Sequence, residues 1–160
     1  MADDDSVRLC LGEGLFPQLG GAVTCLETHF GVELKRAVPM LARRKDRGRS
    51  RIDAVVVGEK IALEYDGWFW HREERRLDSD TWKSQALLDA DWSVIRIREI
   101  AHAGALPALP IDSPRHVEIQ HRRADGFMVE DPVGPCRAIA ALIESLHRQG
   151  SDEDPPVLVT

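Results

Sequence analysis

The chain has 160 residues, of which 43% are hydrophobic and 30% charged, which is typical of one globular domain that folds without disulfides or a structural metal. Its formal net charge of -6 does not by itself indicate a nucleic-acid-binding protein, because such domains usually carry a positive excess. Three well-separated cysteines, Cys10, Cys25 and Cys136, argue against a zinc ribbon and a disulfide-rich scaffold.

The apolar runs are only a few residues long, and the first five residues lack the basic flank and apolar stretch of a signal peptide. We therefore expect a cytoplasmic protein that does not bind a membrane. The expected organisation is a flexible acidic N-terminus over residues 1–12, one domain over residues 13–149, and a disordered acidic tail over residues 150–160.

The N-terminal third predicts a helix, a strand and a basic loop. Apolar residues recur at spacings of three and four from Leu15 to Phe30, which predicts a helix. Residues 32–38 alternate between apolar and polar side chains, as in a half-buried strand, and Pro39 is expected to end that strand. The span 35–51 holds eight basic residues and one acid, a net charge of +7. Taken alone, such a run most often forms a solvated loop.

Two β-rich runs, residues 52–57 and 60–65, flank the pair Gly58-Glu59. Glycine at the first turn position is typical of a two-residue type II′ hairpin. In that register the numbers of paired residues sum to 117. The predicted core face then carries Ile52, Ala54, Val56, Ile61, Leu63 and Tyr65, and the opposite face carries Arg51, Asp53, Glu64 and Asp66.

The same register places Asp53 directly opposite Glu64. Like charges at such a position lie about 4.5–5.5 Å apart at Cβ and destabilise a sheet, so a divalent cation between them would remove the repulsion. The alternative is two exposed acids, each neutralised by a neighbour such as Arg51 or Lys60. Paired carboxylates suit Mg²⁺, which proteins hold with one or two carboxylates, waters and substrate phosphates.

The C-terminal half continues with alternating helices and strands. A helix is predicted from a cap at Asp78 or Ser79 to Asp91, and it is followed by a strand over residues 93–97. The remaining predictions are a short strand over residues 117–119, a loop over residues 121–135, and a helix with an apolar stripe over residues 139–146. This order of elements predicts an α/β sandwich with a mixed central sheet.

Four stretches between residues 51 and 99 form a recognisable pattern: Arg51-Ile52-Asp53, the run from Ile61 to His71, the pair Asp78 and Lys83, and the run from Asp91 to Glu99. This pattern resembles the restriction-endonuclease-like PD-(D/E)xK superfamily and, within it, the very-short-patch-repair endonucleases and their uncharacterised bacterial relatives. The most specific part is the Asp-Gly-x-Phe-Trp-His sequence that ends at His71. The resemblance implies a three-layer sandwich with a mixed central β-sheet flanked by helices.

The resemblance also implies roles for individual residues. Asp53 would be the metal-binding acid of the first strand, Glu64 the acid of the second, and His71 would stand where the repair enzymes carry a catalytic-site histidine. Asp66 occupies the position of the superfamily's lysine, so we expect it to be a direct or indirect ligand. Lys83, from the following helix, would supply the missing positive charge, although an ordinary solvent-facing lysine is equally compatible with the sequence.

Some features of the repair enzymes have no counterpart in this chain. No cysteine follows His71 that would form their zinc site, and their mismatch-wedging N-terminal aromatic residues find no convincing match. Mismatch specificity is therefore not implied. Within the chain, the aromatic residues Trp68, Phe69 and Trp70 are expected to pack mostly in the core, with one ring left to stack on a base.

These observations predict a DNA endonuclease or nickase, acting in repair or defence, that depends on Mg²⁺ or Mn²⁺. Its partners would be DNA and either a second copy of the chain or a separate recognition protein. Because the basic segment directly precedes Asp53, we expect a set of its cations to contact phosphates: Arg43, Arg44, Lys45, Arg47, Arg49 and Arg51. The alternative is an inactive nuclease-fold module that binds nucleic acid or a protein. An RNA nuclease also remains open.

Overall fold

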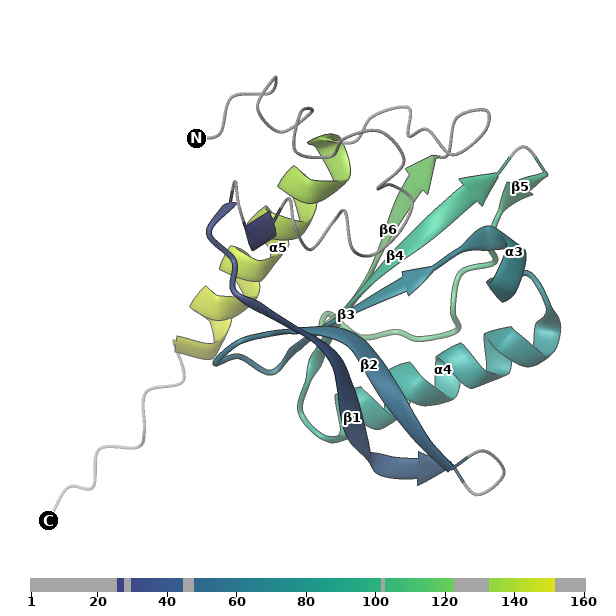
Figure 1. The fold of residues 1–160 in the computed structure, drawn as a ribbon, viewed down its shortest axis with the longest axis horizontal. Coiled ribbons are helices and arrows are strands. Elements are labelled where there is room, and N and C mark those ends of the chain that lie inside the picture. Colours follow the sequence, from purple (N-terminus) through teal and green to yellow (C-terminus); the bar gives the residue numbers. More distant parts are fainter. Residues whose placement is uncertain (1–25, 28–29, 45–47, 102, 123–132, 152–160) are drawn as a thin grey trace, which may run out of the picture.

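The computed structural model describes residues 26–27, 30–44, 48–101, 103–122 and 133–151 (Figure 1). Of the helix predicted between Leu15 and Phe30, the described residues Leu26, Glu27 and Phe30 are helical. The predicted N-terminal segment 1–12 and residues 152–160 of the predicted tail lie outside the described residues. The elements are β1 (Leu34–Arg44), β2 (Gly48–Val56), β3 (Ile61–Asp66), α3 (Trp68–His71), α4 (Glu74–Asp89), β4 (Ser93–Ala101), β5 (Gly104–Ala105), β6 (His116–Arg122) and α5 (Val133–Ser151).

The strands form one mixed sheet in the order β1-β2-β3-β4-β5, and β6 pairs with β4 on a separate branch. Strands β1 and β2, β2 and β3, and β4 and β5 are antiparallel, whereas β3 and β4, and β4 and β6, are parallel. A parallel pair needs a crossover connection, and α4 supplies it between β3 and β4. The predicted α/β class with a mixed sheet is therefore confirmed.

Helices cover both faces of this sheet (Figure 1). On one face, β3 residues Ile61 and Leu63 pack with Cys136, Ile139 and Ile143 of α5. A second cluster lies on the opposite face, where Ala62 of β3 packs with Leu87 and Leu88 of α4. Its members are Met40, Ile52, Val55, Ala62, Leu87, Leu88 and Val94. The prediction that only one face of the hairpin packs in the core is wrong, because the crossover helix of a parallel pair covers the other face. Ile52 also lies on the α4 side rather than with Ala54 and Val56.

The described part of the basic segment, residues 35–44 and 48–51, is not a loop as predicted. It forms β1 and the first half of β2, which pair antiparallel from Leu34↔Val56 to Arg44↔Gly48, with an irregularity between Pro39 and Arg43. Pro39 does not end the strand because β1 is an edge strand, where a residue without an N–H group is tolerated. The predicted boundary at residue 38 was therefore too early.

The register predicted for the second hairpin is confirmed. Ala54 pairs with Leu63 and Val55 with Ala62, so the numbers of paired residues sum to 117. The turn differs from the expected type II′ geometry. The Glu59 N–H donates to the Val56 carbonyl over 3.2 Å, and Gly58 has φ +82°, which puts the glycine in the second central position, as a type II turn requires.

Helix α4 begins at Glu74 rather than at Asp78 or Ser79. Its first turns are solvent-exposed, so they lack the apolar spacing from which a helix is recognised in sequence. Strand β6 is longer than residues 117–119, and both ends of the predicted 121–135 loop belong to regular elements, β6 and α5. No helix in the described part of the chain is long and apolar enough to cross a membrane.

Candidate metal and phosphodiester site

Asp53 and Glu64 lie close together on adjacent strands, although the ladder pairs of β2 and β3 end at Ala54, one residue before Asp53. The Asp53 backbone N–H donates to Glu64 Oε1 over 3.3 Å, and the Tyr65 N–H donates to Asp53 Oδ2 over 2.9 Å. Glu64 is therefore held by the backbone of Asp53, and Asp53 is held by the backbone of Tyr65, the residue after Glu64. Glu64 is only 3% exposed, so it is not one of the two exposed surface acids that the alternative interpretation assumed.

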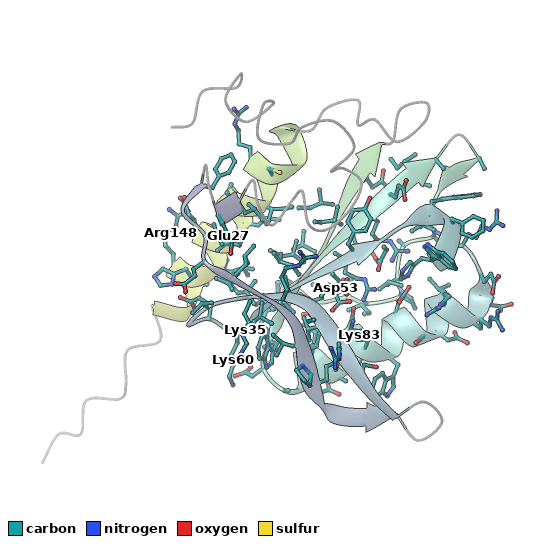
Figure 2. All side chains as sticks on the ribbon, in the orientation of Figure 1. Glu27, Lys35, Asp53, Lys60, Lys83 and Arg148 are labelled. Atoms are coloured by element: carbon teal, nitrogen blue, oxygen red, sulfur yellow. The ribbon has the colours of Figure 1, made fainter. Side chains whose placement is uncertain are left out.

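Lys83 joins this pair from α4. Its Nζ forms a hydrogen bond and an ion pair with Glu64 Oε2, and its side chain is largely buried. Figure 2 shows Lys83 on α4 in the same part of the molecule as Asp53. The structure thus brings together three residues of the predicted site, and the cation reaches the acids from a helix rather than from the strand. The neutralising neighbour of Glu64 is Lys83, and neither Arg51 nor Lys60.

Burial raises the pKa of Glu64 to about 7. Loss of hydration is the main cause, Asp53 adds to it by charge repulsion, and Lys83 and Arg96 act in the opposite direction. A carboxyl group with such a pKa takes up a proton near neutral pH unless further positive charge is supplied. A bound divalent cation would supply that charge.

We expect the free energy of unfolding of the metal-free protein to contain a Glu64 contribution that falls as pH rises from about 4.5 to about 7. In this window the folded state retains a proton on Glu64 that the unfolded chain has lost, so raising the pH favours unfolding. The measurement is urea denaturation in EDTA at intervals across this range for the parent and for Glu64→Gln. The parent should lose stability relative to the variant, whereas the exposed Glu144→Gln control should follow the parent. Parallel curves for parent and Glu64→Gln would contradict the expectation.

Asp66 belongs to a second, fully buried group of charges. Arg96 binds it through two nitrogens at 2.6 and 2.7 Å, and Arg98 Nη1 lies 2.7 Å from Asp66 Oδ2. Asp66 and Arg96 are both completely buried. Burial acts to raise the pKa of Asp66, but hydrogen bonds and charge from the guanidinium groups outweigh it, so the pKa is lowered. Both carboxylate oxygens of Asp66 are thus engaged by arginines.

His71 connects the second group to α4. Its Nδ1 lies 2.6 Å from Asp80 Oδ2 and 3.4 Å from Asp66 Oδ1. Among the described residues, Asp66, His71 and Asp80 are the three potential metal ligands whose donor atoms all lie within 4.8 Å of one another. Asp53, Glu64 and Asp66 do not form such a group, and the predicted set of three metal acids is divided between two clusters.

The residues that sequence reasoning missed are Asp80, Ser84 and the two arginines of β4. Arg96 also donates to the Ser84 hydroxyl over 2.9 Å and lies 3.2 Å from Asp80 Oδ1. A signal was present, because Arg96 and Arg98 alternate with the buried Ile95 and Ile97, and charges inside a strand that is buried on both faces require buried partners. Their partners could not be identified without the parallel pairing that sets Asp66 beside Arg98.

The aromatic turn α3 is exposed, and the expectation that it packs mostly in the core is wrong. Phe69 is 58% and Trp70 67% exposed, and their rings meet edge to face at a centroid distance of 5.1 Å. The turn is anchored by its backbone instead, because the Trp68 N–H donates to the buried Glu99 carboxylate over 2.9 Å. Arg72 lies over the rings of Trp68 and Phe69 at 4.9 and 5.0 Å. Two large apolar rings therefore face solvent next to His71.

The predicted phosphate-contacting residues fall on the first hairpin. Arg43 and Arg44 end β1, and Arg49 lies near the start of β2. Arg51 is exposed two residues before Asp53. Lys45 and Arg47 lie outside the described residues. Asp78 is exposed in the second turn of α4.

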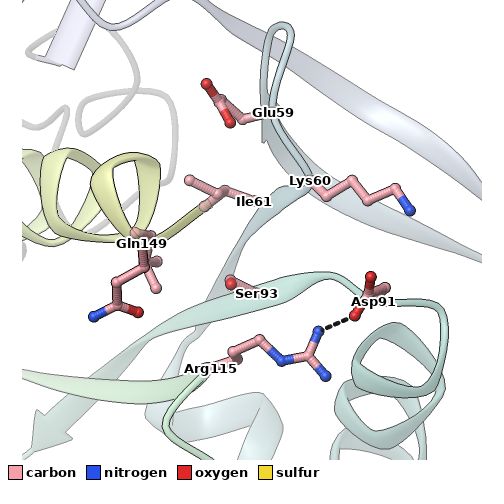
Figure 3. A pocket seen from close by; sticks show the side chains of 8 residues that line it. Glu59, Lys60, Ile61, Asp91, Ser93, Arg115 and Gln149 are labelled. Carbon is pink, nitrogen blue, oxygen red and sulfur yellow. Dashed lines mark hydrogen bonds and ion pairs between the residues drawn. The ribbon is translucent and has the colours of Figure 1, made fainter. Parts of the chain in front are cut away.

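A separate cavity of about 500 Å³ lies at the opposite end of β3, where that strand and β4 begin (Figure 3). Its lining mixes charges of both signs, and Arg115 and Asp91 form an ion pair across 2.8 Å. Charges that neutralise each other do not select one class of ligand. The lining residues are Glu59, Lys60, Ile61, Asp91, Ser93, Arg115, Leu146 and Gln149.

Comparison of the chain with protein-family models gave no match. Comparisons with curated proteins and with solved structures also gave none. The functional interpretation therefore depends on the geometry of the residues themselves.

Proposed function

We propose that the protein is a metal-dependent phosphodiester hydrolase of restriction-endonuclease-like fold that cuts or nicks DNA. The observation that carries this proposal is the arrangement of Asp53 and Glu64 on paired strands with Lys83 bonded to Glu64. Two adjacent carboxylates are suitable ligands for Mg²⁺ or Mn²⁺. A lysine beside them supplies the fixed positive charge that phosphoryl chemistry requires.

In this proposal Asp53 and Glu64 hold the metal ion. A divalent ion held by them would polarise the scissile phosphate and make a bound water more acidic. Water attacks phosphorus and loses a proton to a base, the bond to the leaving oxygen breaks, and the leaving oxygen takes up a proton from solvent. Lys83 stabilises the negative charge that develops on the phosphate oxygens, and its hydrogen bond to Glu64 holds it beside the metal acids.

We assign the proton transfer to His71. When the Nδ1–H group donates a hydrogen bond to Asp80 Oδ2, Nε2 is the unprotonated nitrogen and can accept a proton. Asp66, with both oxygens bonded to arginines, is assigned the role of fixing the end of β3 and the start of α3. It would influence the metal indirectly, through the position of Glu64 two residues earlier.

The exposed rings of Phe69 and Trp70 support a nucleic-acid substrate. An aromatic ring that stacks on a base contributes about 1–3 kcal/mol to binding. Both rings belong to the turn that carries His71, so a base stacked on them would lie close to the proposed proton-transfer residue. The two rings are in contact, and contiguous exposed apolar surface, unlike a single exposed side chain, is typical of interaction sites.

The direct test is incubation of the purified protein with supercoiled plasmid in Mg²⁺, in Mn²⁺ and in EDTA. We expect conversion to the open-circular or linear form that requires a divalent metal. Intact plasmid in every condition would contradict the proposal. It would favour the alternative, a binding module in which the Glu64–Lys83 ion pair has a purely structural role.

A second expected result concerns Lys83. Replacement by Met should lower the metal-dependent nicking rate by about two to three orders of magnitude, the range seen when one preorganised electrostatic group is removed. Lys83→Arg should restore part of the rate. The exposed Arg76→Met on the same helix is the matched control and should leave the rate unchanged. An equal rate in Lys83→Met and the parent would remove Lys83 from the mechanism.

A further inference from the structure

The first hairpin leaves the sheet before it ends. Ladder pairs between β2 and β3 are confined to Ala54 and Val55, whereas β2 pairs with β1 as far as Gly48. Within the described residues, Gly48, Arg49, Arg51 and Ile52 of β2 therefore have ladder partners in β1 alone. Figure 1 shows this two-stranded ribbon extending beyond the other strands. We call the described part of it, residues 39–44 and 48–53, the β1–β2 ribbon.

The charges of the β1–β2 ribbon favour a polyanionic partner. It contains one acid, Asp53, and four arginines, Arg43, Arg44, Arg49 and Arg51. The register sets Arg43 directly opposite Arg49, and like charges at directly opposed positions destabilise a strand pair. A two-stranded hairpin is itself only marginally stable in water. Phosphates bound to the ribbon would convert this repulsion into attraction.

The ribbon is continuous with the proposed metal site. In β2, exposed Arg51 lies two residues before half-buried Asp53. At about 3.3 Å per residue, Arg51 lies about 7 Å and Arg49 about 13 Å along the strand from Asp53. The larger separation is close to the 12 Å width of the major groove of B-form DNA.

We infer that the β1–β2 ribbon binds in the major groove of duplex DNA. One DNA strand lies at Asp53, and the arginines of the ribbon bind phosphates of the other DNA strand, on the far side of the groove. This inference rests on the proposed function and specifies its substrate as a B-form duplex. The major groove of B-form DNA admits a two-stranded β-ribbon. The deep, narrow major groove of an RNA duplex does not, and a single strand offers no second backbone across a groove.

The test is fluorescence anisotropy of the full chain in EDTA, so that binding is measured without cleavage. The probes are a short fluorescein-labelled DNA duplex, an RNA duplex of the same sequence, and one strand of the DNA. Arg49→Ala/Arg51→Ala is compared with Lys60→Ala/Arg148→Ala, which removes two exposed cations away from the ribbon (Figure 2). Circular dichroism melts of both double variants confirm that they fold.

We expect the parent to bind the DNA duplex more tightly than either other probe. For the DNA duplex, we expect the plot of the logarithm of the binding constant against the logarithm of the salt concentration to be less steep for the ribbon variant than for the parent, by about 1.8. Each lost phosphate contact reduces this slope by about 0.9. The ratio of parent affinity to variant affinity should therefore be about 12-fold larger at about 50 mM than at about 200 mM NaCl. Arg49→Lys/Arg51→Lys should restore the slope, and the control pair should leave it unchanged.

Three results would overturn the inference. The first is a loss of DNA-duplex affinity in the control pair equal to that in the ribbon variant. The second is a loss of single-strand affinity in the ribbon variant equal to its loss of duplex affinity, and the third is a parent affinity for the RNA duplex equal to that for the DNA duplex. These outcomes are separate from the plasmid assay, which measures cleavage. Metal-dependent nicking without a ribbon effect would leave the nuclease intact and refute the ribbon. A ribbon effect without nicking would support duplex binding and refute the nuclease.

Discussion

Asp53→Asn should reduce metal-dependent plasmid nicking by about three orders of magnitude or more. Coordination of the metal by a carboxylate supplies several kcal/mol of transition-state stabilisation, and each 1.36 kcal/mol corresponds to about tenfold in rate. Asparagine keeps an oxygen that can accept the Tyr65 N–H, so the hairpin should remain folded. The measurement is the initial nicking rate in Mg²⁺, together with DNA binding at several salt concentrations, which should be largely unchanged.

The matched control for this variant is Asp112→Asn, which removes an exposed carboxylate from a loop and should leave the nicking rate at the parental value. Two outcomes would exclude Asp53 as a metal acid. One is a nicking rate in Asp53→Asn close to that of the parent. The other is a parallel loss of cleavage, DNA binding and thermal stability, which would mean that the residue is needed for the fold.

The largest effect on stability should come from Asp66→Ala. This substitution leaves the buried guanidinium groups of Arg96 and Arg98 without their main counter-charge. Breaking a buried ion pair by removing one partner costs about 3–5 kcal/mol, which is a large part of the free energy of unfolding of a domain of this size. Urea denaturation at neutral pH measures the loss.

The double variant Asp66→Ala/Arg96→Met separates a buried charge network from simple loss of packing. We expect it to be less destabilised than the sum of the two single variants, because the second substitution removes a charge that the first left unpaired. Arg75→Ala, which breaks an exposed ion pair with Glu73, should change the free energy of unfolding by less than about 1 kcal/mol. Strict additivity in the double variant would show that the two side chains act independently.

The geometry of the Asp53–Glu64 pair was predictable because it depends on local chain structure. A glycine-containing turn of even length fixes which residues of a hairpin oppose each other, and the observed pairs Ala54↔Leu63 and Val55↔Ala62 follow that register. The turn type was wrong, but an error in turn type that preserves the even spacing leaves the facing residues unchanged. The sequence of β3 and β4 likewise indicated strands on either side of a helix.

The environment of these acids was not predictable in the same way. Whether Glu64 faces solvent or the protein interior depends on α4, which crosses from β3 to the parallel strand β4 and covers that face. The same crossing brings Lys83 to Glu64 and Asp80 to His71. No local spacing specifies a contact between residues that approach each other only when the crossover helix packs on the sheet.

The secondary structure of the basic segment depended on tertiary pairing as well. Its high charge and Pro39 favour a loop when the segment is considered alone, yet an edge position beside β2 accommodates both. The sequence by itself therefore determined the strand register and the identity of the two opposed acids, because neighbouring residues control both. Only the tertiary structure decided which charges are buried and which cations neutralise them, because these contacts join segments that are distant along the chain.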